Sequence, residues 1–129
     1  NIFIEGMFTD RKIGDFSLRT DFVASSLRAN KNDVPYEPSF KIRADYSRRL
    51  FDFLLVKAKL EYIGERFANI ENSTKLSSYN IFSIGFEYFY NSKFNISLDL
   101  QNLLNSNVII WNGYKEREFN FKLGITYKF

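Results

Sequence analysis

Two of the side chains that most often carry out chemistry in proteins are missing from this chain. Its 129 residues contain no cysteine and no histidine, which removes thiol nucleophiles, disulfides and the usual general base. The carboxylates of Glu61 and Asp99 are acid–base candidates, but nothing in the sequence places them together. We therefore predict no catalytic residue, no metal site and no cofactor, and we expect that the chain is not an enzyme.

The charged residues alternate with apolar ones, and this alternation is the dominant pattern of the sequence. Apolar or aromatic residues at every second position predict β-strands rather than helices. The pattern recurs in seven segments, at residues 2–8, 16–24, 40–46, 54–62, 82–90, 94–101 and 119–129. The net charge is +3 with an isoelectric point near 9.1. Because both signs are scattered along the chain, we expect no nucleic-acid partner.

The links between these strands alternate in length. Short links are expected at 10–15, 48–51 and 91–93. Long polar links are expected at 26–39, 64–77 and 103–118. One interpretation is a soluble antiparallel sandwich with the apolar faces packed together. The other is a transmembrane β-barrel, whose strands of nine to eleven residues alternate and are joined by short periplasmic turns and long extracellular loops.

The barrel interpretation is favoured. A ten-residue strand rises about 33 Å, or roughly 23 Å along the membrane normal when it is tilted, which fits the apolar band of such barrels. Tyrosines near the strand ends suit interfacial girdles; they are Tyr46, Tyr62, Tyr88, Tyr90 and Tyr127. We predict an all-β, antiparallel transmembrane barrel segment with about seven long strands.

One face of this segment would be polar and would line the barrel interior. Its members are Arg19, Asp21, Lys41, Arg43, Asp45, Lys57, Lys59, Glu61, Glu87, Asp99, Gln101 and Lys122. For most of them we expect solvation and ion pairing between neighbouring strands, rather than ligand binding.

The last strand resembles the C-terminal signal of bacterial outer-membrane proteins. The matching residues are Phe121, Leu123, Ile125, Tyr127 and Phe129. The resemblance implies that they are recognised by the barrel-assembly machinery.

A second resemblance is to TonB-dependent outer-membrane receptors, over roughly residues 40–129. It is carried by Leu98 to Asn105, then by Trp111-Asn112-Gly113-Tyr114 with Glu116-Arg117, and by the stretch from Glu61 to Phe67. Here Leu104 replaces the usual Phe, and 115–117 lacks the common Pro-Gly. We expect Asn102 and Asn105 to shape a turn, and Trp111 and Tyr114 are candidates for ligand contacts in an outer loop.

The resemblance implies a 22-stranded barrel around a plug, located in the outer membrane of a Gram-negative bacterium. Residues 1–129 would be its C-terminal portion, with the plug and earlier strands outside this chain. The implied partners are membrane lipid, lipopolysaccharide, the assembly machinery, the remaining strands and plug, and TonB through that plug. The implied cargo is a scarce nutrient such as an iron chelate, cobalamin or a glycan.

Three alternatives stay open. The first is a small stand-alone barrel of porin or adhesion type, with its interior filled by side chains. The second is an outer-membrane enzyme, which the lack of histidine disfavours. The third is a soluble sandwich that binds a partner through an exposed aromatic face.

Overall fold

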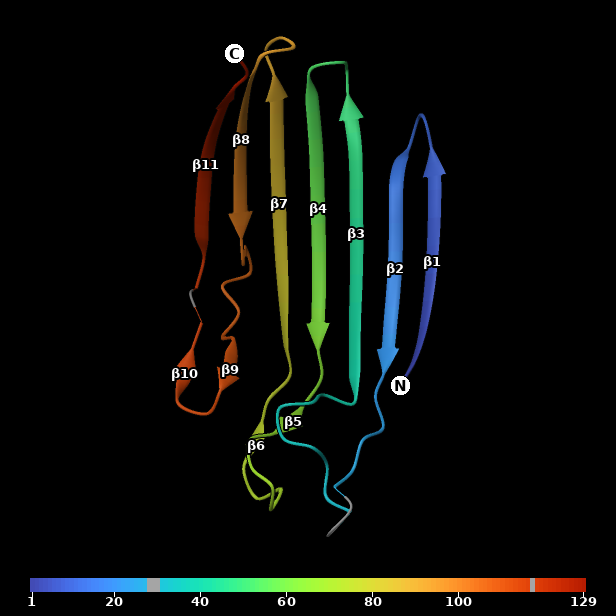
Figure 1. Ribbon diagram of the computed structural model, residues 1–129, viewed down its shortest axis with the longest axis vertical. Coiled ribbons are helices and arrows are strands. Elements are labelled where there is room, and N and C mark those ends of the chain that lie inside the picture. Colours follow the sequence, from blue (N-terminus) through green and yellow to red (C-terminus); the bar gives the residue numbers. More distant parts are fainter. Residues whose placement is uncertain (28–30, 117) are drawn as a thin grey trace.

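The structure, a computed structural model, describes residues 1–27, 31–116 and 118–129. Seven long antiparallel strands form one sheet in the order β1-β2-β3-β4-β7-β8-β11 (Figure 1). They are β1 (Ile2–Asp10), β2 (Gly14–Phe22), β3 (Phe40–Leu50), β4 (Leu54–Ile63), β7 (Tyr79–Phe89), β8 (Phe94–Gln101) and β11 (Asn120–Tyr127). The prediction of an all-β, antiparallel fold with seven long strands is confirmed.

The links alternate between short and long as predicted, so the short turns gather at one end of the sheet and the long loops at the other (Figure 1). Polar side chains close two of the turns. The Asp10 carboxylate accepts hydrogen bonds from the backbone N–H groups of Lys12 and Ile13, at 2.7 and 2.9 Å. The Asn91 side chain does the same for Lys93 and Phe94. Short polar side chains of this kind are the usual residues of tight turns.

The register of the strands places most of the apolar residues of all seven on one face. Leu18 pairs with Ala44, and Ala44 pairs with Leu60. At the other edge of the sheet, Leu98 pairs with Leu123. Because side chains alternate along a strand, a slip of one residue in any pairing would move that strand's apolar set to the polar face. The alternation in the sequence is therefore what specifies this register.

Several predicted boundaries are wrong. The turn expected at 48–51 lies at 51–53, because β3 continues through Arg48 and Arg49 to Leu50, which pairs with Leu54. Strand β7 begins at Tyr79 rather than at residue 82, since Tyr79 pairs with Ile63. Strand β2 ends at Phe22 rather than at residue 24, and β11 ends at Tyr127 rather than at residue 129. In each case pairing with the neighbouring strand, which composition does not reveal, sets the end.

The long loops contain four further strands that the alternation did not predict. They are β5 (Arg66–Phe67), β6 (Lys75–Leu76), β9 (Ile109–Trp111) and β10 (Tyr114–Lys115). Strands β5 and β6 pair with each other, as do β9 and β10. Each is too short to show a period of two. These loops also hold the buried large apolar side chains of the described chain, Leu76 and Val108.

Neither face of the large sheet is covered by a second layer. Within the described ranges all seven long strands belong to one sheet and make their extensive contacts with their neighbours in it, so they do not divide into the two packed sheets of a sandwich. Strands β1 and β11 form the two edges and do not pair with each other, so the sheet is open and is not a closed barrel. No helix in the described part of the chain is long and apolar enough to cross a membrane.

The pairing is staggered in one direction across the sheet. A row of directly paired residues runs from Phe8 in β1, two positions before the last residue of that strand, to Phe121 in β11, six positions before its last residue. The row passes through Phe16, Tyr46, Ala58, Ile84 and Leu100. The strands are therefore inclined to the line of paired residues. A stagger of this kind is the shear that a sheet needs in order to close into a barrel.

Cysteine cross-linking tests the register, and the absence of native cysteine makes the readout clean. We expect Leu98→Cys with Leu123→Cys to form a disulfide on mild oxidation, because directly opposed Cβ atoms lie about 4.5–5.5 Å apart. The control is Ser97→Cys with Leu123→Cys, whose side chains lie on opposite faces. Equal cross-linking of both pairs would contradict the register.

Candidate functional site

The polar face of the large sheet brings together the charged residues that the alternation predicted. Arg43 lies between Arg19 on β2 and Glu61 on β4, and Asp99 on β8 faces Lys122 on β11. The predicted sharing of one face is confirmed for these strands. Two apolar residues of β1, Phe3 and Met7, also lie on this face.

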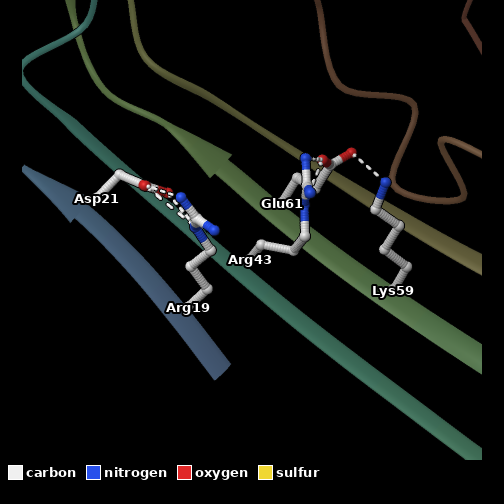
Figure 2. A network of polar contacts seen from close by, with 5 residues as sticks. All are labelled: Arg19, Asp21, Arg43, Lys59 and Glu61. Atoms are coloured by element: carbon white, nitrogen blue, oxygen red, sulfur yellow. Dashed lines mark hydrogen bonds and ion pairs between the residues drawn. The ribbon is translucent and has the colours of Figure 1, made fainter. Parts of the chain in front are cut away.

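An ion-pair network crosses β2, β3 and β4 on this face (Figure 2). The Arg19 guanidinium binds Asp21 on its own strand, with Nη2 to Oδ1 at 2.8 Å. The Arg43 guanidinium reaches across to Glu61, with Nη2 to Oε1 at 3.0 Å. Lys59 binds the other oxygen of the same carboxylate at 3.1 Å. Glu61 therefore neutralises one cation of its own strand, Lys59, and one of the neighbouring strand, Arg43. Asp21 balances Arg19, which lies opposite Arg43.

A second set of polar contacts lies further along the face, between β4, β7 and β8. Lys57 Nζ lies 3.6 Å from Glu87 Oε2, and the Asn95 amide donates to the other oxygen at 2.8 Å. The side chains of all these pairs are partly exposed, so each pair is worth at most about 1 kcal/mol. The network therefore makes a partly exposed, ion-paired surface rather than a core that holds the sheet together.

A hollow of about 870 Å³ lies against this polar face. Its walls come from all seven long strands and from the last long loop, and they include Met7, Asp45, Lys59, Asp99, Lys122 and Tyr114. Gly85 leaves room for Asp99, because a Cβ at Gly85 would lie 2.8 Å from the Asp99 Oδ1 atom. A smaller hollow of about 490 Å³ borders Arg19, Asp21 and Arg43. Both hollows are lined by a mixture of polar, charged and apolar side chains.

The two acid–base candidates lie on this face but far apart. Glu61 is paired with Ile81 of β7, and Asp99 with Gly85 of the same strand. The two pairing positions are therefore separated by about 13 Å along β7, from the rise per strand residue, and Glu61 and Asp99 are two strands apart in the other direction. Glycosidase carboxylates are about 5–10 Å apart, so the geometry does not support an acid–base pair. No cluster of metal-ligating side chains occurs in the ranges that the structure describes.

The three long loops contact one another; we call the described residues of 23–39, 64–78 and 102–119 the loop cluster. The backbone N–H of Tyr36 donates to the Phe67 carbonyl at 2.7 Å. The Asn72 side chain accepts from the N–H of Asp33 at 2.7 Å and donates to its carbonyl at 3.1 Å. The first two loops are thus joined at more than one point.

Arg66 connects the second loop to the third. Its side chain is buried, at 5% exposure, and its guanidinium donates to the backbone carbonyls of Ser77 and Ile109. The guanidinium also lies 5.1 Å from the centroid of the Tyr79 ring. A buried guanidinium needs such partners, since an unpaired buried charge is costly. The sequence indicated Arg66 only as part of the resemblance at 61–67, and no local signal shows a contact with residue 109.

The two aromatic candidates for ligand contact lie opposite each other in the β9–β10 hairpin. Trp111 pairs with Tyr114, and Gly113 between them has a φ of 79°, which glycine adopts readily. The Trp111 ring packs against Tyr36 of the first loop, with centroids 4.6 Å apart. Both rings stay exposed, at 54% for Trp111 and 61% for Tyr114. Trp111 therefore joins two loops, while Tyr114 borders the larger hollow, and ligand contact remains a prediction for both.

Neighbouring residues of the third loop follow the predicted turn chemistry. Asn102 and Asn105 have positive φ values of 52° and 51°, and the Asn102 side chain bonds both to the N–H and to the carbonyl of Ser106. Their predicted role in a turn is confirmed. Nearby, a hydrogen bond from Lys115 lowers the pKa of the exposed Glu118. Arg117, which belongs to the stretch that resembles the receptors, lies outside the described residues.

The residues that resemble an assembly signal lie on or just after the edge strand. Phe121, Leu123, Ile125 and Tyr127 share the apolar face of β11 and are all more than half exposed. Phe129 follows the strand, and its ring packs edge-on to Tyr127, with centroids 5.2 Å apart. They therefore form one accessible apolar row. Recognition by an assembly machinery remains a prediction.

Comparison with known proteins identifies no family for this chain: no protein-family model matches it, and no curated protein matches it.

Replacing Arg66 tests the loop cluster. We expect Arg66→Met to speed hydrogen exchange in 64–78 and 102–119 and to cost about 1–3 kcal/mol, because buried carbonyls lose their donor. The matched control is Lys75→Met in the same loop, where the side chain is exposed and pairs only with Glu65. Unchanged exchange in 102–119 of the Arg66 variant would contradict the role of Arg66.

Proposed function

We propose that this chain is the C-terminal part of the barrel of a TonB-dependent outer-membrane receptor, which takes up a scarce nutrient such as an iron chelate, cobalamin or a glycan. The observation that carries the proposal is the continuous apolar face of the seven-stranded sheet. It includes Ile4, Leu18, Leu60, Leu123 and Ile125, each at least 41% exposed. No layer of the described chain covers these residues.

The size of this face supports a lipid environment. Seven strands spaced by about 4.8 Å, each rising about 26–36 Å, give an apolar face on the order of 1,000 Å². The largest apolar patch on a soluble monomer is usually about 300–600 Å². Hydrocarbon is the covering that a sheet of this shape needs, and the polar face then lines a hydrated interior. The stagger of the register agrees with barrel geometry.

Aromatic rings near the short turns support an interfacial position for that end. Phe51 stacks on Phe53, and Phe53 packs edge-on to Tyr88, with centroids 5.3 and 5.7 Å apart. The Tyr46 hydroxyl donates to the Ile13 carbonyl at 2.7 Å. Rings with one apolar side and one polar tip suit the membrane–water boundary. In the proposed orientation the short turns face the periplasm and the loop cluster faces outward.

The assignment to a TonB-dependent receptor, rather than to a membrane barrel of another kind, has two supports. The first is the resemblance at 98–105 and 111–114, which falls on the Asn102–Asn105 turn and on the β9–β10 hairpin. The second is the direction of the edges. Seven antiparallel strands leave β1 and β11 running the same way, so antiparallel closure requires an odd number of additional strands (Figure 1). A larger barrel would supply these strands, together with the plug on which TonB acts.

Detergent dependence tests the proposal that the apolar face lies in a membrane. We expect far-UV circular dichroism of the 129-residue chain to show β-structure with lipid or detergent, and aggregation in plain buffer, because the apolar face then lacks a covering. A folded, soluble monomer in plain buffer would refute the proposal. A stable closed monomer in detergent would refute only the assignment to a receptor, since a barrel closed by this chain alone needs no further strands.

Charge placement tests which face meets lipid. We expect Leu98→Arg to cost about 2–4 kcal/mol on folding into bilayers, the usual cost of an arginine on the lipid face near the midplane. Ser97→Arg, one residue away on the polar face, should cost much less. The measurement is denaturant titration of chains refolded into vesicles. Similar costs at the two positions would show that the assigned faces are wrong.

A further inference from the structure

Arg48 is a charged residue on the apolar face. It follows Tyr46 by two positions in β3, pairs with Val56 of β4, and precedes Leu50 on the same face. Apart from Asp10 at the last position of β1, it is the one charged residue that the described long strands place there. Its neighbour Arg49 lies on the opposite face, with its guanidinium 4.8 Å from the centroid of the Phe89 ring.

The Arg48 guanidinium has no counter-ion within the sheet. Among residues 1–27, 31–116 and 118–129, no carboxylate lies within 4.0 Å of it, and the residue is exposed. Its Cβ packs against Gly14 of β2, where a built Cβ would lie 3.0 Å away. The missing side chain at Gly14 therefore lets β2 and Arg48 approach each other closely. A cation on a lipid-facing surface is costly, so the guanidinium needs a polar group within reach of its long stem.

The end of the sheet nearest Arg48 is positively charged. The cations at or beside the short turns are Arg11, Lys12, Arg48, Arg49, Lys93 and Lys128, and the carboxylates are Asp10, Asp15, Asp52 and Glu87. The Asp10 carboxylate is already engaged by two backbone N–H groups of its own turn. Arg48 lies two residues before the end of β3, which is about 7 Å along the strand and within reach of a headgroup beyond the turns. The partner that matches this charge is an anion.

We propose that Arg48 binds the phosphate of an anionic glycerophospholipid at the short-turn end of the sheet. The guanidinium fork matches two phosphate oxygens, and this pairing is stronger than that of neutral groups. The proposal rests on the proposed function, because it requires the apolar face to lie in lipid. In that orientation the short turns meet the periplasmic leaflet, where a headgroup lies beside Tyr46 and Arg48 together.

The test compares two adjacent arginines. Arg48→Gln and Arg49→Gln each remove one positive charge at nearly the same height of the sheet, but from opposite faces. The wild-type chain and both variants are compared. Each is mixed with vesicles of phosphatidylcholine, alone or with phosphatidylglycerol, and bilayer-bound protein is measured by flotation. We expect phosphatidylglycerol to raise vesicle binding of the wild type and of Arg49→Gln. The gain should be about fivefold smaller in Arg48→Gln, because one arginine at an anionic surface contributes about 1 kcal/mol.

Each other outcome has a definite meaning. Equal losses in both variants would show a general charge effect and overturn the proposal, as would no loss in either. Wild-type chain that stays out of phosphatidylcholine vesicles would overturn the proposed function together with this inference. If Arg48→Gln fails to form β-structure, Arg48→Lys replaces it, because it keeps the charge without the fork. That variant should lose part of the gain, and full retention would overturn the proposed phosphate contact.

Discussion

The hydrogen bonds between strands are the interaction on which the rest of this structure depends. No second layer packs on the large sheet within the described ranges, so side-chain burial contributes little to holding its strands together. In water each such bond contributes only about 0.5–1.5 kcal/mol, whereas in an apolar medium it is worth about 4–6 kcal/mol. A sheet that is held by its backbone ladder is therefore weak in water and strong in hydrocarbon. The exposed apolar face and this dependence on backbone hydrogen bonds agree with the lipid environment that we propose.

The sequence predicted the strands and their faces, which depend on the local alternation of side chains. It did not predict the features that depend on contacts between residues far apart in the sequence. The strands and their faces follow from alternation, which any stretch such as 40–46 displays by itself. The end of β3 did not follow, because Arg48 and Arg49 resemble turn residues and only their pairing with Val56 and Leu55 keeps them in the strand. The contact of Trp111 with Tyr36 joins loops 75 positions apart in the sequence, so no periodicity reveals it.

Charged side chains are neutralised or hydrogen-bonded in two different ways, one on the polar face and the other in the loop cluster. On the polar face the ions are partly exposed, paired across strands and individually weak, as in the contact of Arg43 with Glu61. In the loop cluster one buried arginine, Arg66, binds backbone carbonyls instead of carboxylates. Pairs of the first kind exchange readily with water. The hydrogen bonds of Arg66 join two loops, and they hold the backbone of β9 in the hairpin that carries the exposed rings of Trp111 and Tyr114.

The pairing of the edge strand also has a mechanical consequence. A pull on one strand along its own axis slides it past its neighbour. Many ladder bonds then carry the load together, whereas a pull across the sheet at one end would open them one after another. The edge strand β11 pairs with β8 over its whole length, from Asn120 to Tyr127. Sliding it by one position would break every bond of that ladder at once, so this edge resists tension along the strands far better than peeling.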